Sequence, residues 1–181
     1  MKYLIASDIH GDLDSANRIF EAFDREKADK LLLLGDLLYH GPRNDLPPTY
    51  APKKVIELLN ERRDTILAVR GNCDTEVDQM VLSFPILADY AYLDFDGLTV
   101  LMTHGHKFNP ENLPPMSKGE ILLHGHTHIL ACDELECGIY RLNPGSAAIP
   151  KGGNPRSYAT FESKLFTVKD LDGNTIISKQ F

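Results

Sequence analysis

Residues 1–36 read MKYLIASDIHGDLDSANRIFEAFDREKADKLLLLGD, and they give the clearest indication of the fold class. Residues 3–6 and residues 31–34 are short apolar runs, as expected of strands that are covered on both faces. Between them, residues 15–27 place apolar side chains at the spacing of an amphipathic helix. A strand, a helix and a second strand in this order predict a right-handed crossover between parallel strands.

The following residues continue this alternation and then change character. Residues 53–63 predict a second helix and residues 66–69 a third buried strand. Residues 75–83 predict a short helix, with Thr75 and Asp78 arranged as a capping box. The first half of the chain is therefore of the α/β class.

The second half is mostly β. Residues 90–95 and 98–103 flank Asp96-Gly97, a pair suited to a tight hairpin turn. The pattern returns at residues 165–168 and 175–178, around Asp172-Gly173, and residues 121–123 and 139–142 add two further short strands. Two sheets packed face to face with helices outside would bury all these runs. No linker or repeat divides the chain, so residues 1–181 are expected to form one domain.

Bulk composition excludes some classes of function. The net charge of −7 argues against a stable complex with nucleic acid or binding to an anionic membrane. No apolar run approaches the length of a membrane helix. Three cysteines without repeated spacing do not indicate a disulfide framework. We therefore expect a cytoplasmic protein with reduced thiols.

Chemistry is concentrated in five short clusters, and most of them directly follow apolar runs. Because such runs read as strands, we expect the polar residues to emerge together at one edge of a sheet. The clusters are SDIHG (7–11), LLGDLL (33–38), RGNCD (70–74), MTHGH (102–106) and HGHTH (124–128). The candidate metal ligands within them are Asp8, His10, Asp36, Asn72, His104, His126 and His128.

These residue types suit a centre with two divalent metal ions. Two ions about 3.5–4 Å apart can clamp a phosphoryl group and activate a water for in-line attack. Such a centre needs a carboxylate that touches both ions, and Asp36 is placed to do so because it follows a central strand. Asp8 and His10 lie two residues apart and would point the same way in an extended segment, and the same holds for His126 and His128.

In this order, the clusters resemble the motif set of the calcineurin-like metallophosphoesterase superfamily, and NPGS at 143–146 belongs to the same pattern. The small size and the loop sequences are most similar to those of the YfcE-type bacterial phosphodiesterases. The resemblance implies the metallophosphoesterase fold, a four-layer α/β/β/α sandwich of two mixed sheets flanked by helices. Some members of such families form dimers or tetramers, so a homodimer or homotetramer is open.

The resemblance also implies the roles of individual residues. One ion would be held by Asp8, His10, Asp36 and His128, and the other by Asp36, Asn72, His104 and His126. Catalytic parts would fall to Asp36, Asn72, Cys73 and His104. Mixed nitrogen and oxygen ligation suits Mn²⁺, Zn²⁺, Fe, Ni²⁺ or Mg²⁺, and the family favours Mn²⁺.

The chain departs from the family pattern at Cys73. The superfamily usually has a histidine after Gly-Asn, and this histidine donates a hydrogen bond to the phosphoryl group or the leaving oxygen. A thiol is a weaker and shorter donor. We therefore expect weak assistance to the leaving group, and Asp74, which commonly supports that histidine, loses its usual partner.

Other polar residues near the clusters allow two interpretations each. Asn72 could simply cap the following helix, and His40 is more typical of a loop residue than of a ligand. His106 falls on the same side as His104 in an extended segment, so it could contact substrate, whereas His124 is expected to face packing. Charged loop residues could be solvated surface groups or could bind phosphate, and these are Arg43, Lys107, Lys151 and Arg156. Arg43, with its neighbour Asn44, is the best candidate to touch a phosphate oxygen.

The sequence thus predicts a phosphodiesterase that hydrolyses a small-molecule phosphodiester by in-line attack of a metal-bridging hydroxide. Two alternatives remain open. One is a phosphomonoesterase with the same metal chemistry and a different pocket. The other is an interaction scaffold like the retromer subunit of this fold, in which the metal site has eroded. All seven ligand positions here hold competent residues, which favours the enzyme.

Overall fold

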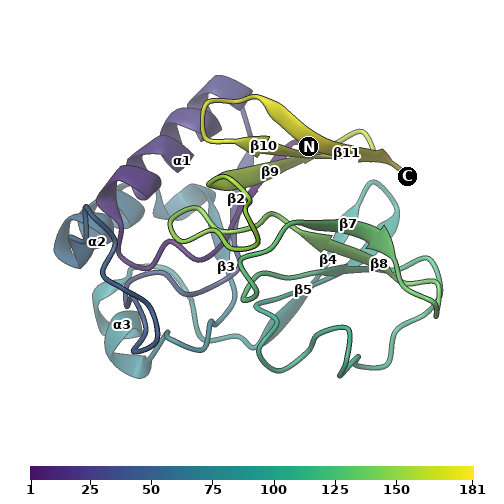
Figure 1. Ribbon diagram of the computed structural model, residues 1–181, viewed down its shortest axis with the longest axis horizontal. Coiled ribbons are helices and arrows are strands. Elements are labelled where there is room, and N and C mark those ends of the chain that lie inside the picture. Colours follow the sequence, from purple (N-terminus) through teal and green to yellow (C-terminus); the bar gives the residue numbers. More distant parts are fainter.

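The computed structural model describes residues 1–181, and its core is built on the parallel strands that the first residues predict (Figure 1). The elements in chain order are β1 (Tyr3–Ala6), α1 (Leu13–Glu26), β2 (Lys30–Leu33), α2 (Pro52–Glu61), a 3₁₀ turn (Arg63–Thr65), β3 (Ile66–Ala68), α3 (Glu76–Val81), β4 (Tyr90–Phe95), β5 (Leu98–Thr103), β6 (Ile121–Leu123), β7 (Ala131–Glu134), β8 (Tyr140–Asn143), β9 (Ser157–Glu162), β10 (Leu165–Asp170) and β11 (Thr175–Gln180). None of the helices is long and apolar enough to span a bilayer.

The strands form two mixed sheets. The six-stranded sheet has the order β11-β10-β9-β1-β2-β3, in which β1, β2 and β3 are parallel and β9, β10 and β11 are antiparallel. The five-stranded sheet has the order β4-β5-β6-β8-β7, with a parallel centre and an antiparallel strand at each edge. The predicted pair of mixed sheets is confirmed.

Helix α1 covers the six-stranded sheet because its apolar residues share one face. Asp12 caps its first turn by accepting a hydrogen bond from the backbone N–H of Ser15 at 3.0 Å. The helix ends at Lys27, which adopts a left-handed conformation with a φ of 52°. The buried side chains of α1 and α2 pack with one face of β1 and β2 in the larger hydrophobic core.

A second core lies between the two sheets. It contains residues from both sheets, with three phenylalanines at its centre, and all three are fully buried: Phe95, Phe161 and Phe166. The rings of Phe95 and Phe161 have their centroids 4.5 Å apart. This dry interior fixes the distance between the sheets and hence the relative position of their edges.

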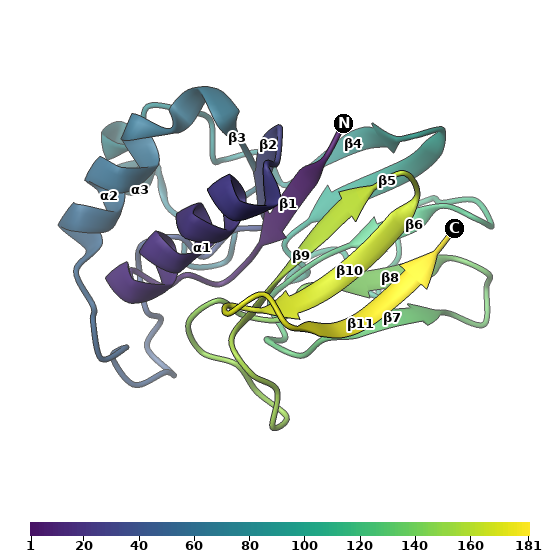
Figure 2. The same ribbon diagram turned by 90° about the horizontal axis from the view of Figure 1, so that it is seen from above.

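The outer layers of the sandwich are unequal. All helices gather on one side, away from the five-stranded sheet (Figure 2). The outer face of that sheet is covered instead by loop side chains, which pack on Leu101, Leu122 and Ile139. The sandwich predicted from the sequence is confirmed, but its fourth layer consists of loops because no helix follows Val81.

Two strands were absent from the sequence-based prediction. Strand β9 pairs with both β1 and β10, and it joins the C-terminal hairpin to the central strands. Strand β7 forms the edge beside β8. The capping box at Thr75 and Asp78 is confirmed, and Asp78 is also one of two acidic residues in the first turn of α3, near the positive end of the helix.

Removing the Phe161 ring tests the importance of the core between the sheets. Phe161→Ala is expected to lower the free energy of unfolding by about 3–5 kcal/mol, because it leaves a cavity among residues that cannot all collapse into it. Urea denaturation without metal measures this loss. Tyr92→Ala is the control, since Tyr92 is 53% exposed and the change should cost about 1 kcal/mol or less. Equal losses in the two variants would contradict the assignment of the core.

Candidate metal centre

The polar clusters meet at the carboxyl ends of the central strands, as the sequence predicts. Asp8 follows β1, Asp36 follows β2, and Asn72 lies beyond β3. From the other sheet, His104 follows β5 directly, and the HGHTH cluster follows β6. Parallel strands from two facing sheets thus deliver these side chains to one place.

The local backbone differs from the extended segments that we expected. Asp8, His10, Asp36, His126 and His128 all have left-handed conformations, with φ between 50° and 66°. In non-glycine residues this conformation costs free energy and is concentrated at functional sites. The side chains converge because the chain turns sharply at each of them, and not because alternate residues of a strand share a face.

Three side chains form the first half of the centre. Asp8 Oδ1 lies 3.2 Å from His128 Nε2 and 3.7 Å from His10 Nε2. The two imidazole nitrogens are 3.3 Å apart. Asp36 Oδ2 is 3.8 Å from His10 Nε2, so the fourth ligand expected for this ion is also adjacent.

The second half of the centre shares Asp36. Its Oδ2 lies 3.5 Å from His104 Nε2. The same nitrogen is 3.1 Å from Asn72 Oδ1 and 3.2 Å from His126 Nδ1. Asp36 Oδ2 therefore lies close to histidines of both groups.

Backbone carbonyl groups fix the tautomers of three of these histidines. Each donates its Nδ1–H to a carbonyl oxygen and directs Nε2 inward, as metal-binding histidines usually do. The pairs are His10 with Tyr39 at 2.8 Å, His104 with Leu34 at 2.7 Å, and His128 with Ile149 at 2.6 Å. The Nε2 lone pairs of neutral His10 and His128, with their nitrogens 3.3 Å apart, repel one another unless a cation lies between them.

The charges of the cluster also favour a bound cation. Asp8 Oδ1 is buried and has no hydrogen-bond partner. Burial lowers the pKa of His104, but the hydrogen bond to Asp36 and the charges of both carboxylates outweigh this effect and raise it to about 9. Burial lowers the pKa of His126 to about 4. The cluster thus attracts one positive charge onto His104 when no metal is present, and its donor set fits divalent cations.

Asp74 organises the backbone around Asp36, a role that the sequence did not reveal. Its carboxylate accepts backbone N–H bonds from Asp36 and Gly71 at 2.8 Å and from Leu37 at 2.9 Å. Burial, together with the charge of Asp36, raises the pKa of Asp74 to about 6 against the effect of these bonds. Asp74 therefore holds the left-handed turn at Asp36 without needing the histidine that is absent at position 73.

Two glycines allow the backbone to pass directly against the carboxylates. A Cβ atom on Gly71 would lie 2.1 Å from Asp36 Oδ1. One on Gly125 would lie 1.9 Å from Ser7 Oγ and 2.9 Å from Asp8 Oδ2. Since neither space can hold a methyl group, both glycines are required for the geometry of the centre.

The NPGS segment supports the first cluster from behind. Ser146 Oγ donates a hydrogen bond to the carbonyl oxygen of Asp8 at 2.9 Å. The backbone N–H of Ala147 donates to the carbonyl oxygen of Ser7 at 3.0 Å. This loop, which precedes β9, therefore helps to hold the turn that presents Asp8.

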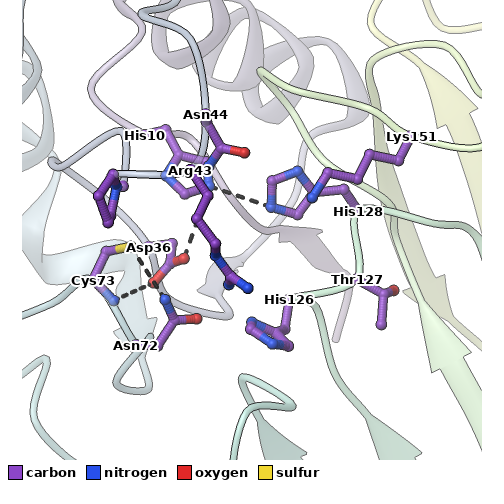
Figure 3. Close-up of a pocket in the computed structure, with 12 residues that line it drawn as sticks. His10, Asp36, Arg43, Asn44, Asn72, Cys73, His126, Thr127, His128 and Lys151 are labelled. Atoms are coloured by element: carbon purple, nitrogen blue, oxygen red, sulfur yellow. Dashed lines mark hydrogen bonds and ion pairs between the residues drawn. The ribbon is translucent and has the colours of Figure 1, made fainter.

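The centre opens into a polar cavity of about 380 Å³ (Figure 3). Arg43 and Asn44 line it from one loop, and Thr127 and Lys151 line it from the opposite side. Arg43 and Lys151 are exposed and form no ion pair with any carboxylate of the protein. The sequence favoured a surface role for Lys151, but the structure brings it to the cavity beside His128, because its backbone N–H donates to the His128 carbonyl oxygen at 3.0 Å.

Other candidate residues lie outside this cavity. The ring of His106 is 5.4 Å from that of His104, between centroids, but His106 does not line the cavity. Lys107 pairs with Asp89 at 2.8 Å and Arg156 with Asp14 at 2.8 Å, so both are bound elsewhere.

The two proline-rich loops differ in their relation to the centre. Pro42 begins the one that lines the cavity, with Arg43 and Asn44. Pro110 and Glu111, in the second loop, line a separate cavity of about 300 Å³ on another side of His126. Only the first loop therefore shapes the space in front of the centre.

Cys73 is nearly buried and lies at the wall of the cavity. Its backbone N–H donates to Asp36 Oδ1 at 2.8 Å, and its sulfur lies 3.2 Å from the donating Nδ2 of Asn72. Burial raises the pKa of the Cys73 thiol well above its usual range, and the charge of Asp36 adds to this effect. The side chain is a neutral thiol at physiological pH.

His124 faces the interior, as expected. Its Nδ1 lies 3.0 Å from the Gly125 carbonyl oxygen, whereas Nε2 is buried with no partner. Burial lowers the pKa of His124 to about 4. The unfolded chain takes up a proton here below pH of about 6.5, whereas the folded protein does so only near pH 4, so this residue costs stability as the pH falls through that window.

This titration predicts a measurable effect in the metal-free protein. When the pH falls from 7 to 4.5, the free energy of unfolding should decrease less in the His124→Gln variant than in the parent. The difference between the two decreases should be on the order of 2 kcal/mol. Urea denaturation in EDTA at both pH values measures the difference, and the comparison at pH 7 gives the packing cost of the substitution alone. Parallel losses in the two proteins would show that His124 does not titrate in this way.

Comparison with known proteins shows the family. The model of the calcineurin-like phosphoesterase superfamily domain matches residues 1–164. The chain is 47% identical over 179 residues to the phosphodiesterase YfcE of Escherichia coli K12, and the match covers 99% of this chain and 97% of that protein.

Solved structures agree with this result. The structure of YfcE, described as a phosphoesterase from E. coli, matches with a TM-score of 0.95 over 99% of this chain and 98% of that chain, at 47% identity. Vacuolar protein sorting 29 from Cryptosporidium parvum shares the fold, with a TM-score of 0.65 and 21% identity over 99% of this chain and 97% of that one. The chain belongs to the calcineurin-like phosphoesterase superfamily.

Proposed function

We propose that this protein is a binuclear metal-dependent phosphodiesterase acting on small phosphodiesters. The observation that carries the proposal is the convergence of buried carboxylates and inward-facing imidazole nitrogens on both sides of Asp36. The 47% identity to a relative named phosphodiesterase supports the same reaction class.

Two divalent ions, preferentially Mn²⁺, would be held by the two ligand groups that share Asp36. When bound, they would supply charge neutralisation at the phosphoryl oxygens and an activated water. The residues of the protein position them: the carbonyl groups that fix each imidazole and the N–H groups that fix Asp74 and Asp36 leave little freedom at the site.

Arg43 and Lys151 give the cavity its affinity for an anion. The protein as a whole carries a net charge of −7, so a diester anion is repelled at a distance and must be attracted locally. These two cations, from opposite sides of the cavity, lack carboxylate partners of their own. Arg43, together with Asn44, is proposed to orient a phosphate oxygen, and a role for His106 would have to be indirect because it lies outside the cavity.

From the neutral thiol of Cys73 we expect a preference for diesters with good leaving groups. The S–H group of Cys73 is a weak hydrogen-bond donor, and its pKa is strongly raised. Such a thiol transfers a proton poorly to a departing alkoxide. Phenolate-like leaving groups need little such help.

The completeness of the ligand set separates this proposal from the scaffold alternative. A protein that only binds partners can lose imidazole ligands without harm, whereas all seven proposed ligands are present and oriented here. The likeness to vacuolar protein sorting 29, at 21% identity, concerns the fold alone.

Removal of metal tests the proposal directly. EDTA is expected to abolish hydrolysis of bis(p-nitrophenyl) phosphate, and excess Mn²⁺ should restore it, because the reaction depends on bound ions. His128→Ala should lose activity about 100-fold or more and regain little with Mn²⁺. Including p-nitrophenyl phosphate in the assay tests the monoesterase alternative. Hydrolysis that is indifferent to EDTA would refute the mechanism.

Replacement of Cys73 by histidine tests the role of the thiol. Cys73→His should raise kcat for an alkyl diester such as glycerophosphoethanolamine by about tenfold or more, because an imidazole can protonate the leaving oxygen. Hydrolysis of bis(p-nitrophenyl) phosphate should change by less than about threefold, since p-nitrophenolate leaves readily. An unchanged rate for the alkyl diester in a folded variant would disprove the hypothesis.

A further inference from the structure

A second hollow of about 410 Å³ lies beside the catalytic cavity and has an opposite character. Most of the side chains that line it are hydrophobic, whereas the catalytic cavity is polar. We call it the apolar groove, and define it by Tyr39, Tyr50, Ile56, Val77 and Val81, with Cys73 at one end.

Helices α2 and α3 form the walls of the apolar groove. Ile56 comes from α2, and Val77 and Val81 come from α3. Asn60 of α2 fixes the two helices together: its Nδ2 donates to the Val81 carbonyl oxygen at 2.9 Å, and its Oδ1 accepts from the Ser83 N–H at 2.7 Å. The groove is therefore part of the folded framework and does not depend on a single loop.

The aromatic side of the groove is connected to the metal centre. The carbonyl oxygen of Tyr39 accepts the Nδ1–H bond of His10 at 2.8 Å, so the residue that carries this exposed ring also orients a proposed ligand. The ring of His40 packs edge-on against both Tyr39 and Tyr50, at centroid distances of 4.7 Å and 5.4 Å. These contacts join the rings of Tyr39 and Tyr50 through His40.

Cys73 lines both the groove and the catalytic cavity. Its side chain is small, and its backbone N–H is bonded to Asp36. The groove therefore adjoins the cavity in which a phosphodiester would be held, and Cys73 belongs to the lining of both.

Several apolar side chains of this groove are exposed. Tyr39 is 42% exposed, Val81 44% and Val77 68%, although they lie next to a proposed catalytic cavity. Exposed apolar side chains gathered beside a polar site are typical of ligand recognition, and aromatic walls favour a planar ring.

From these observations we infer that the apolar groove binds one ester group of the substrate and that this group carries an aromatic ring. The inference rests on the proposed function, which supplies the phosphate that the centre holds. The groove would confer selectivity for aryl over small alkyl diesters through apolar contact, while the metal centre and Arg43 recognise the phosphate common to both.

Direct binding measurements test this assignment. Isothermal titration of the Mn²⁺-loaded protein would compare diphenylphosphinate with dimethylphosphinate, which carry the same anionic PO₂ group, differ in their substituents and have no ester bond to hydrolyse. The parent should bind diphenylphosphinate about tenfold or more tightly than dimethylphosphinate, as expected from burial of one ring. The double variant Val77→Ser/Val81→Ser should lose most of this preference, while its affinity for dimethylphosphinate should stay within about twofold.

The matched control is Met80→Ser on the same helix. Met80 is apolar and 84% exposed but does not line the groove, so this variant should keep the full preference. Val77→Ser alone, at the more exposed position, should give an intermediate preference and guards against misfolding of the double variant. Thermal melting would establish that all variants are folded.

The outcomes separate this inference from the proposed function. An undiminished preference in the double variant, or no preference in the parent, would overturn the assignment of the groove. If the parent binds diphenylphosphinate through the groove yet does not hydrolyse bis(p-nitrophenyl) phosphate, the groove is supported and the proposed function is refuted. An equal loss in the Met80→Ser control would also overturn the inference, because the effect would then not belong to the groove.

Discussion

The polar ligands of the metal centre repel one another, and much of the surrounding structure serves to hold them together. Two buried carboxylates and several imidazole nitrogens face one another at distances between 3.2 Å and 4.0 Å. Without positive charge this arrangement opposes folding. The protein sustains it through rigid supports outside the site: carbonyl oxygens that orient the rings, and Asp74, which gathers three N–H groups around the turn at Asp36. The core between the sheets fixes the position of the ligands of one sheet relative to those of the other.

Much of this organisation could be predicted from the sequence. Apolar runs followed at once by polar clusters indicated strands that deliver their next residues to one edge, and the structure places Asp8, Asp36 and His104 there. The two Asp-Gly pairs predicted hairpins because few other residues suit such turns, and both hairpins are present. These predictions rest on local rules that act within a few residues, which explains why they succeeded.

The features that were missed depend on contacts between distant residues. The sequence SYATFE carries no clear alternation, and β9 is recognised only from its partners β1 and β10. Asp74 looked unsupported beside Cys73 because its partners are N–H groups, which every residue possesses. The left-handed turns at His126 and His128 were missed for a related reason: non-glycine residues seldom adopt this conformation, and here the surrounding contacts impose it. Lys151 is held at the cavity by a backbone hydrogen bond to His128, which cannot be predicted from a pattern of side chains.

The tight approach of Gly71 and Gly125 to the acidic ligands has a consequence for how such a centre can change. Neither residue offers a functional group, yet adding a single carbon atom to either would push a carboxylate or its neighbouring hydroxyl out of place. A descendant could thus retain every coordinating side chain and still lose the ability to hold ions. If only the ligands were inspected, such a protein would be judged active. The residues found in place of Gly71 and Gly125 would reveal the defect.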